Sequence, residues 1–305
     1  MNLNKSIKDT ILNFLNPFRL VKIIKLQRNR KNNNKKKVQL DPQLKLYADV
    51  LKNDFLHYGY FEDTNKDPRT ISLKDIDGAQ LDYAKLFLAQ ITDTQNPVLD
   101  IGCGMGGLIK LLLKHQYLPV GITPDEHQVQ YICQKYQNVE MHHCKFEDFK
   151  DHSSRFGTLI TSESLQYLKL DQALPLIQKI MLPNGKWLIC DYFRTQNNAF
   201  EKSGHQLDTF LNALKTHNLN VTYQKDITQN VAVTLDYLYY MAQNLGLPVL
   251  DFLTKKYEIK APGFYFASQK LVKGIDDNIK NGIEVINPKR FLAEKKYIFM
   301  VVERA

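Results

Sequence analysis

Residues 98–107 read VLDIGCGMGG: an apolar run ends at Asp100, and glycines follow at positions 102, 104, 106 and 107. The run predicts a short buried strand, and GLIKLLLKHQ after it predicts a helix, so the glycines occupy a strand-to-helix turn. Glycine at such a turn tolerates unusual φ angles and lets the backbone approach a ligand closely. The dinucleotide fingerprint is G-x-G-x-x-G, whereas the spacing here is G-x-G-x-G-G, and Asp100 would repel a diphosphate. The stretch therefore favours a ligand with a cationic group, and a nicotinamide dinucleotide is the less favoured alternative.

Strands alternate with helices on both sides of this turn. A helix is predicted to start near Ser72 or Asp75 and to run through AQLDYAKLFLAQI, and further helices are predicted over 107–116, 124–136 and 173–181. Strands are predicted over 97–102, 117–123, 138–144, 156–163, 186–193 and 295–304. Because strands alternate with helices of this length, we expect right-handed βαβ units on a mostly parallel sheet.

Three regions are expected along the chain. Residues 1–40 form a basic amphipathic extension and linker, residues 41–195 and 291–305 form the core, and residues 196–290 form a substrate cap inserted before the last strand. The segment 196–290 is more helical and aromatic than the core, so we expect a helical, aromatic-rich cap rather than a repeat of the sheet.

The 305 residues carry a formal charge of +9, and this charge is concentrated at the N-terminus. Residues 1–40 contain eleven Lys or Arg and one acid and sum to +10, so the rest of the chain is nearly neutral at −1. Nucleic-acid binding usually needs a basic face on the folded domain, so a nucleic-acid partner is not expected. The four cysteines lack the paired spacing of a zinc site or a disulfide framework. No metal is therefore expected, and the cytoplasm is the expected compartment.

The N-terminal extension has two open interpretations. Apolar side chains recur near helical spacing from Ile7 to Val21, with Lys and Arg between them, and the basic run RNRKNNNKKK follows. Such a segment suits an anionic membrane surface, which would make the protein peripheral on the inner face of a membrane through residues 1–37. The alternative is a helix packed on the body, followed by a solvated linker. No apolar run is long enough for a membrane-spanning helix.

VLDIGCGMGG resembles the first motif of class I S-adenosylmethionine-dependent methyltransferases. The resemblance covers about residues 45–200 and the last strand. It implies their Rossmann-like α/β fold, a doubly wound, mostly parallel seven-stranded sheet, with S-adenosyl-L-methionine as the cofactor. It also implies that Gly102, Gly104 and Gly106 pass under the methionine part of the cofactor and that Asp100 serves its amino group.

The same resemblance places the rest of the cofactor site at the ends of the following strands. Where the family often has an acid that binds the ribose, this chain has Thr123, and Thr123 with Gln128 resembles a segment of cyclopropane-fatty-acid-synthase-like enzymes. Phe146 would stack on the adenine ring, and Glu147 would contact the edge of that ring. Alternatively, Phe146 could be a core residue that contacts no ligand, and Gln128 could be a surface residue. The expected cofactor residues are Tyr58, Tyr60, Asp100, Gly102, Gly104, Gly106, Thr123, Gln128, Phe146, Glu147 and Ser162.

The aromatic segment HYGYF at residues 57–61 distinguishes two branches of the family. Cyclopropane synthases carry a Cys where this chain has Tyr58, and a Glu-His pair where it has Gln166 and Tyr167. Both departures remove ligands of the bicarbonate that those synthases use as a base, so cyclopropanation is the alternative rather than the first choice. HYGYF also resembles the corresponding segment of tocopherol-type small-molecule methyltransferases, in which Tyr58 and Tyr60 would help to close the cofactor pocket.

Three residues are candidates for a catalytic base. Glu163 follows the fourth predicted strand beside the cofactor, Asp191 lies at the carboxyl end of the fifth, and His205 lies in KSGHQLD. Asp191 could instead pair with Arg194, and His205 could be a structural or surface residue. Placement favours Glu163.

The substrate side is predicted more coarsely. Gln166, Tyr167 and Tyr265 are the expected substrate contacts, and the Tyr, Leu and Met residues of the cap suit an apolar acceptor. We therefore expect a methyltransferase that acts on an oxygen or carbon of a small lipophilic molecule. The alternatives are a cyclopropane-synthase-like lipid enzyme and, from another class, a non-catalytic cofactor-binding protein or partner subunit.

Overall fold

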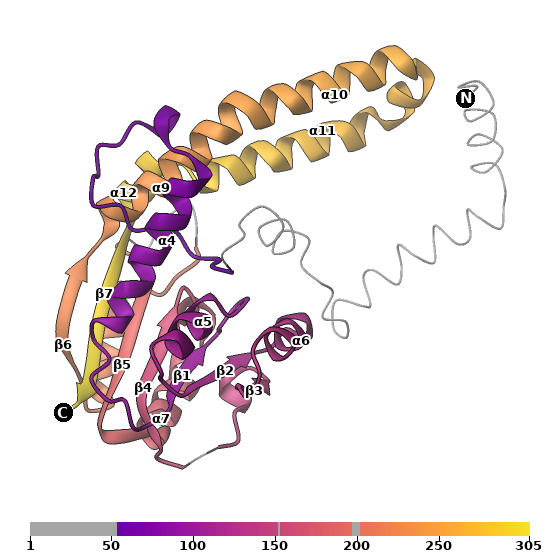
Figure 1. The fold of residues 1–305 in the computed structure, drawn as a ribbon. Coiled ribbons are helices and arrows are strands. Elements are labelled where there is room, and N and C mark those ends of the chain that lie inside the picture. Colours follow the sequence, from indigo (N-terminus) through magenta and orange to yellow (C-terminus); the bar gives the residue numbers. More distant parts are fainter. Residues whose placement is uncertain (1–53, 152, 197–201) are drawn as a thin grey trace. The chain divides into compact units, whose positions relative to one another are not determined.

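A single seven-stranded sheet organises the protein. The computed structural model describes residues 54–151, 153–196 and 202–305, so the predicted N-terminal extension lies outside the described part. The strand order is β3-β2-β1-β4-β5-β7-β6, and β7 alone runs antiparallel to its neighbours (Figure 1). The strands are β1 (Val98–Ile101), β2 (Pro119–Thr123), β3 (Glu140–His143), β4 (Phe156–Ser162), β5 (Met181–Arg194), β6 (Leu219–Asp226) and β7 (Lys295–Arg304). The predicted doubly wound, mostly parallel sheet is confirmed.

Helices cover both faces of this sheet. One face packs against α4 (Leu73–Leu88), α5 (Gly107–Lys114), α9 (Thr228–Met241) and α12 (Pro288–Glu294). The other face packs against α7 (Leu170–Ile180) and α8 (Leu207–Thr216). Helix α6 (Glu126–Lys135) lies beside α5, where Ile132 packs against Ile109. Because the sheet is covered on both sides, its central strands are buried and mostly apolar, as in β1, where all four residues of VLDI are buried.

Residues 207–226 form part of the sheet layer, which corrects the expectation that they belong to the cap. They fold into α8 and β6, and β6 pairs with β7 from Leu219 opposite Arg304 to Asp226 opposite Ile298. As an edge strand, β6 is largely exposed, so its sequence LNVTYQKD lacks the apolar run that marked the central strands. The helical insertion before the last strand therefore consists of α9 to α12.

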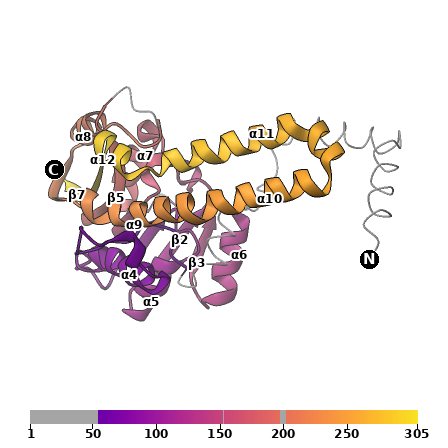
Figure 2. The same ribbon diagram turned by 90° about the horizontal axis from the view of Figure 1, so that it is seen from above.

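A helical hairpin makes up much of that insertion. Helix α9 continues through the π-helical turn Ala242–Gly246 into α10 (Leu247–Lys260), and α11 (Pro262–Val285) returns beside α10. Figure 1 shows the hairpin of α10 and α11 apart from the sheet, and in both views its two helices run side by side (Figures 1 and 2). No residue of either helix is buried. Across the described ranges, no helix is both long enough and apolar enough to cross a membrane.

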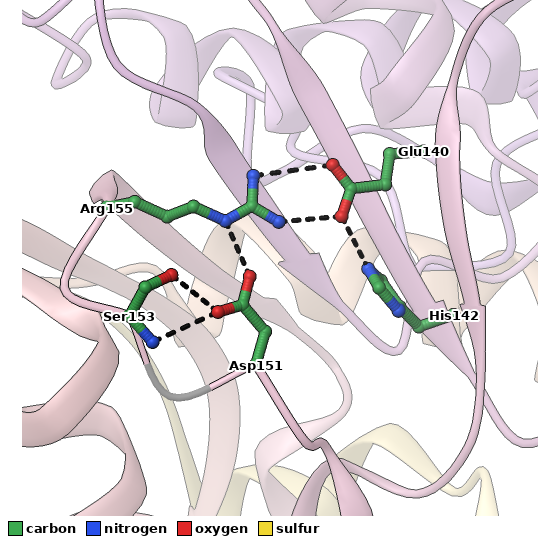
Figure 3. Close-up of polar contacts among 5 residues, drawn as sticks. All are labelled: Glu140, His142, Asp151, Ser153 and Arg155. Atoms are coloured by element: carbon green, nitrogen blue, oxygen red, sulfur yellow. Dashed lines mark hydrogen bonds and ion pairs between the residues drawn. The ribbon is translucent and has the colours of Figure 1, made fainter.

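An ion-pair network joins the amino ends of β3 and β4 (Figure 3). Arg155 bridges Glu140 at 2.6 Å and Asp151 at 2.6 Å, and Glu140 also contacts His142 at 2.8 Å. Arg155 further stacks over the ring of Phe156, with 4.5 Å between its guanidinium carbon and the ring centroid. The network lies where these strands begin, whereas ligands of parallel sheets bind where the strands end. We therefore interpret it as structural.

The start of α4 provides a test of local stability. Ser72 caps the helix by accepting the N–H of Asp75, and Asp75 accepts the N–H of Ser72 in return. Replacing Ser72 with Ala should lower the free energy of unfolding by about 1 kcal/mol, because both capping interactions are disturbed. Urea unfolding would measure this. The exposed neighbour variant Lys74→Ala should change stability by less than about 0.5 kcal/mol.

Candidate functional site

The glycine turn after β1 is held in a conformation that other residues rarely adopt. Gly102 and Gly106 have φ angles of +80° and +82°. A Cβ on Gly102 would lie 2.5 Å from the Cβ of Ser164, and one on Gly106 would lie 2.9 Å from a side-chain carbon of Ile132. The Ser164 hydroxyl also donates to the carbonyl of Ile101. The turn is therefore fixed between the loop after β4 and helix α6, with its backbone close to any ligand.

Asp100 places an unsatisfied carboxylate directly before this turn. Its side chain is 2% exposed, and its Oδ2 has no hydrogen-bond partner among the described residues. Burial alone raises the pKa of Asp100 to about 7. A buried carboxylate without a partner is costly, and a cationic group supplied by a ligand would remove much of that cost. The amino group of S-adenosylmethionine fits this requirement.

Thr123 and Gln128 meet beside the same turn. The Thr123 hydroxyl donates to Oε1 of Gln128 over 2.6 Å, and it accepts the backbone N–H of Asp125 over 3.2 Å. Both side chains are buried, so the alternative interpretation of Gln128 as a surface residue is wrong. Since β2 pairs with β1 up to Ile122 opposite Ile101, the two polar groups end next to the glycine turn. They remain the predicted ribose ligands.

A cavity of about 590 Å³ opens at the carboxyl ends of these strands. Gly102, Phe146, Glu147 and Tyr167 line it, so four residues predicted from sequence share one cavity. Phe146 is 2% exposed and also belongs to the core, so its two interpretations are compatible. Glu147 accepts the backbone N–H of Lys169 over 2.8 Å. Residues that the sequence did not single out complete the lining: Ile101, Ile122, Pro124, Cys144, Lys145, Asp148, Ser164, Leu168, Lys169 and Gln172.

Glu163 follows β4 in a strained backbone conformation, and its side chain is half-buried. Its φ angle is +52°, and its Oε1 accepts the N–H of Tyr58 over 2.9 Å and the hydroxyl of Tyr297 over 2.5 Å. Burial raises the pKa of Glu163 to about 7, although both hydrogen bonds act in the opposite direction. A carboxylate with a pKa near neutrality suits general-base chemistry.

A cluster of tyrosines surrounds Glu163, and most of its members were not predicted from the sequence. The hydroxyls of Tyr83 and Tyr297 lie 3.0 Å apart, and the ring of Tyr58 meets that of Tyr297 edge-on at 6.4 Å. Ser162 donates to the Tyr83 hydroxyl over 3.3 Å, so this predicted cofactor residue is oriented toward the cluster. Tyr83 and Tyr297 belong to α4 and β7, where their apolar neighbours made them indistinguishable from core residues.

Asp191 and His205 both anchor the turn η3 (Leu165–Tyr167). Asp191 accepts the N–H of Gln166 over 3.2 Å, and burial together with the charge of Glu163 raises its pKa to about 8. The His205 ring bonds to the carbonyl of Leu165 at 3.0 Å, and burial lowers its pKa. Arg194 bonds to the carbonyl of Gly204. Gln166 accepts the hydroxyl of Tyr192, so η3 is held from several sides.

Two predicted residues are engaged elsewhere. The Tyr60 hydroxyl accepts from Lys225 of β6 over 2.9 Å, and its backbone N–H bonds to Ala79 of α4. Tyr265 lies near the start of α11, and its ring meets that of Tyr257 of α10 at 5.8 Å. Tyr265 therefore belongs to the projecting hairpin, and the structure does not bring it to the cavity at the sheet edge.

The central part of the chain matches a known protein family. Residues 98–185 match the family described as Methyltransferase domain. The chain is also 26% identical over 117 residues to a sterol 4-C-methyltransferase of Caenorhabditis elegans. The matched stretch covers 35% of this chain and 34% of that protein, so the chain spans about a third of the length of the curated relative it matches.

Solved structures share the fold over most of the chain. Geranyl diphosphate C-methyltransferase from Streptomyces coelicolor A3(2) aligns with a TM-score of 0.60 at 14% identity, over 90% of this chain and 96% of its own. The [4+2]-cyclase SpnF aligns with a TM-score of 0.62 at 14% identity, over 88% of this chain and 95% of its own. At this identity the likeness shows the fold alone, and one of the two proteins is named for a reaction other than methyl transfer.

Asp100 provides a test in which stability and ligand affinity move in opposite directions. At about pH 8 the parent buries a charge at this position, so Asp100→Asn should raise the free energy of unfolding of the ligand-free protein by about 1–3 kcal/mol. The gain should shrink as the pH falls from about 7 to about 4. In that window Asp100 is protonated in the folded parent and ionised in the unfolded parent, so lowering the pH stabilises the folded parent.

The same variant should bind S-adenosylhomocysteine at least about tenfold more weakly in calorimetry, because the amino group loses its ionic partner. The exposed Asp208→Asn variant is the matched control and should change neither quantity. Unchanged affinity in Asp100→Asn would show that this carboxylate is not the ligand of the amino group.

Proposed function

We propose that this chain, whose residues 98–185 form a class I S-adenosylmethionine-dependent methyltransferase domain, transfers a methyl group to an oxygen or carbon of a small lipophilic acceptor. The observation that carries the proposal is the buried, unsatisfied Oδ2 of Asp100 beside a glycine turn and a cavity of about 590 Å³. A carboxylate in that state calls for a cationic ligand, and the amino group of S-adenosylmethionine is such a group.

The cofactor would be held by residues from the ends of β1, β2 and β3. Asp100 would bind its amino group, Thr123 and Gln128 its ribose hydroxyls, and Phe146 its adenine ring. When bound, S-adenosylmethionine supplies a methyl group that its sulfonium already makes electrophilic. The protein must then orient a nucleophile and exclude water, which a cavity between the sheet edge and η3 suits.

Glu163 is the proposed base. Both hydrogen bonds from Tyr58 and Tyr297 end on its Oε1, so Oε2 is the oxygen that would take a proton from the acceptor. Its pKa of about 7 means that a large fraction is ionised at neutral pH and able to accept that proton. Asp191 and His205 are proposed as positioning residues, since their hydrogen bonds go to η3.

Two observations support a lipophilic acceptor. The tyrosine cluster of Tyr58, Tyr83 and Tyr297 gives the surroundings of Glu163 an apolar character with a few hydroxyls for orientation. A sterol 4-C-methyltransferase and a geranyl diphosphate C-methyltransferase are among the similar proteins, and both are named for methyl transfer to carbon of a lipophilic molecule. Sterols and isoprenoids are therefore the first acceptors to examine.

The acceptor experiment uses methyl-labelled S-adenosylmethionine with sterols, isoprenoid alcohols and diphosphates, unsaturated fatty acids and a fractionated cell extract. Label in an organic-soluble product supports the proposal, and mass spectrometry with NMR identifies the atom that received it. Loss of an alkene together with a gained carbon would indicate cyclopropanation instead. Cofactor binding without transfer to any fraction would indicate a non-catalytic protein and overturn the proposal.

Glu163→Gln should lower kcat about 10²–10³-fold, because the amide cannot accept the proton, and should change cofactor affinity by less than about threefold. In the parent, kcat should rise as the pH increases through about 7, where Glu163 ionises, and this rise should be absent in the variant. The exposed Glu126→Gln variant should behave as the parent. Wild-type turnover in Glu163→Gln would exclude Glu163 as the base.

A further inference from the structure

Exposed apolar side chains run along the projecting hairpin of α10 and α11. Phe252, Ile259 and Phe266 are 59%, 76% and 75% exposed, and Leu245, Val249 and Leu271 are each close to half exposed or more. Single exposed apolar residues are common on protein surfaces, whereas a contiguous set of this size marks an interaction surface.

Several of these residues point away from the groove between the two helices. On α10, Leu247, Asp251 and Thr254 line that groove, and they are spaced by four and three residues. The exposed Leu245, Val249 and Phe252 have the same spacing but are displaced by two residues, which is more than half a helical turn. On α11, Leu271 and Ile275 are displaced in the same way from the groove residues Gln269 and Lys273. These apolar side chains therefore face away from the groove and are open to a partner.

Charge separates along the length of the hairpin. The outer part, residues 252–275, contains Lys255, Lys256, Lys260, Lys270 and Lys273 but only one acid, Glu258. The inner part carries Asp251, Asp276, Asp277 and Glu284 against Lys280. The end that points away from the sheet is therefore cationic as well as apolar, and the end next to the body is acidic (Figure 1).

We propose that the outer part of this hairpin, residues 252–275, docks on an anionic lipid surface. Lys side chains beside apolar and aromatic ones are the combination that binds such a surface, because the cations meet the headgroups while the rings enter the boundary of the acyl chains. Lys256 and Phe252 lie together on this surface, with the Lys256 Nζ 5.6 Å from the centroid of the Phe252 ring. Neither helix can span a bilayer, so the hairpin lies at the surface.

The proposal does not depend on methyl transfer, and it concerns a different segment from the basic residues 1–37. An acidic inner end and a cationic outer end would orient the body away from the lipid while the outer end inserts. The alternative partner is a second copy of the chain. Its acidic counterpart to these lysines would have to be the acidic inner end of its own hairpin. The experiment distinguishes the two.

The direct probe is a tryptophan at the outer end of the full-length chain. The single native tryptophan, Trp187, is fully buried, so its signal should not respond to lipid. Phe266→Trp should show a blue-shifted emission and quenching by brominated lipid on phosphatidylcholine vesicles that contain about one-third phosphatidylserine. Leu118→Trp, at an exposed apolar position before β2, is the matched control and should show neither change.

Charge reversal completes the test. Lys260→Glu combined with Lys270→Glu should weaken binding to the anionic vesicles by at least about tenfold, whereas Lys74→Glu combined with Lys150→Glu should have little effect. Circular dichroism should be unchanged, because all four side chains are on the surface.

Three outcomes would overturn the proposal. The first is Phe266→Trp emission that does not change with vesicles, which would show that the hairpin stays out of the lipid. The second is emission that is blue-shifted without lipid and varies with protein concentration, which would indicate a second copy as the partner. The third is a concentration-independent blue shift without lipid, which would indicate that residues 1–53 cover the hairpin.

Discussion

The hydrogen bond from the Tyr297 hydroxyl to Glu163 joins the last strand of the sheet to the loop after β4. The candidate site depends on this contact, because it holds a half-buried carboxylate in a backbone conformation that is uncommon for a glutamate. Tyr297 reaches Glu163 because β7 runs antiparallel and therefore begins at the edge where the parallel strands end. The reversed strand that completes the methyltransferase fold thus supplies one of the groups that orient the proposed base.

Two buried acids and one half-buried acid lie at this edge of the sheet, and the pKa of each is raised. Asp100 lies before the glycine turn, Glu163 after β4 and Asp191 within β5, and desolvation is the largest cause in every case. Glu163 and Asp191 are partly compensated by backbone N–H groups, whereas Oδ2 of Asp100 has no such partner among the described residues. Such an arrangement lowers stability, and its retention is understandable where a cationic ligand and a proton transfer need it.

The fold separates two kinds of recognition. The edge of the sheet, with its glycine turn and buried acids, suits a small charged cofactor, whereas exposed apolar and cationic side chains belong to the hairpin of α10 and α11, which lies apart from the sheet (Figure 1). A lipophilic acceptor and a lipid-binding hairpin would be consistent with each other, since such an acceptor partitions into the membrane. Each proposal nevertheless rests on its own residues and can fail independently.

The sequence by itself determined the strands of the sheet apart from β6, and it predicted a cofactor site at the turn after β1. The apolar run before Asp100, the glycine spacing and the alternation of strands with helices are local patterns, and local patterns are what periodicity detects. It could not reveal that Tyr83 and Tyr297 surround Glu163, because these contacts span 79 residues or more and depend on how strands are ordered. It also missed β6, whose exposed edge position removes the apolar alternation, and it placed Tyr265 near the substrate although the hairpin carries it away. Only the tertiary structure decided these points, because side-chain environment and strand order arise from packing rather than from neighbouring residues.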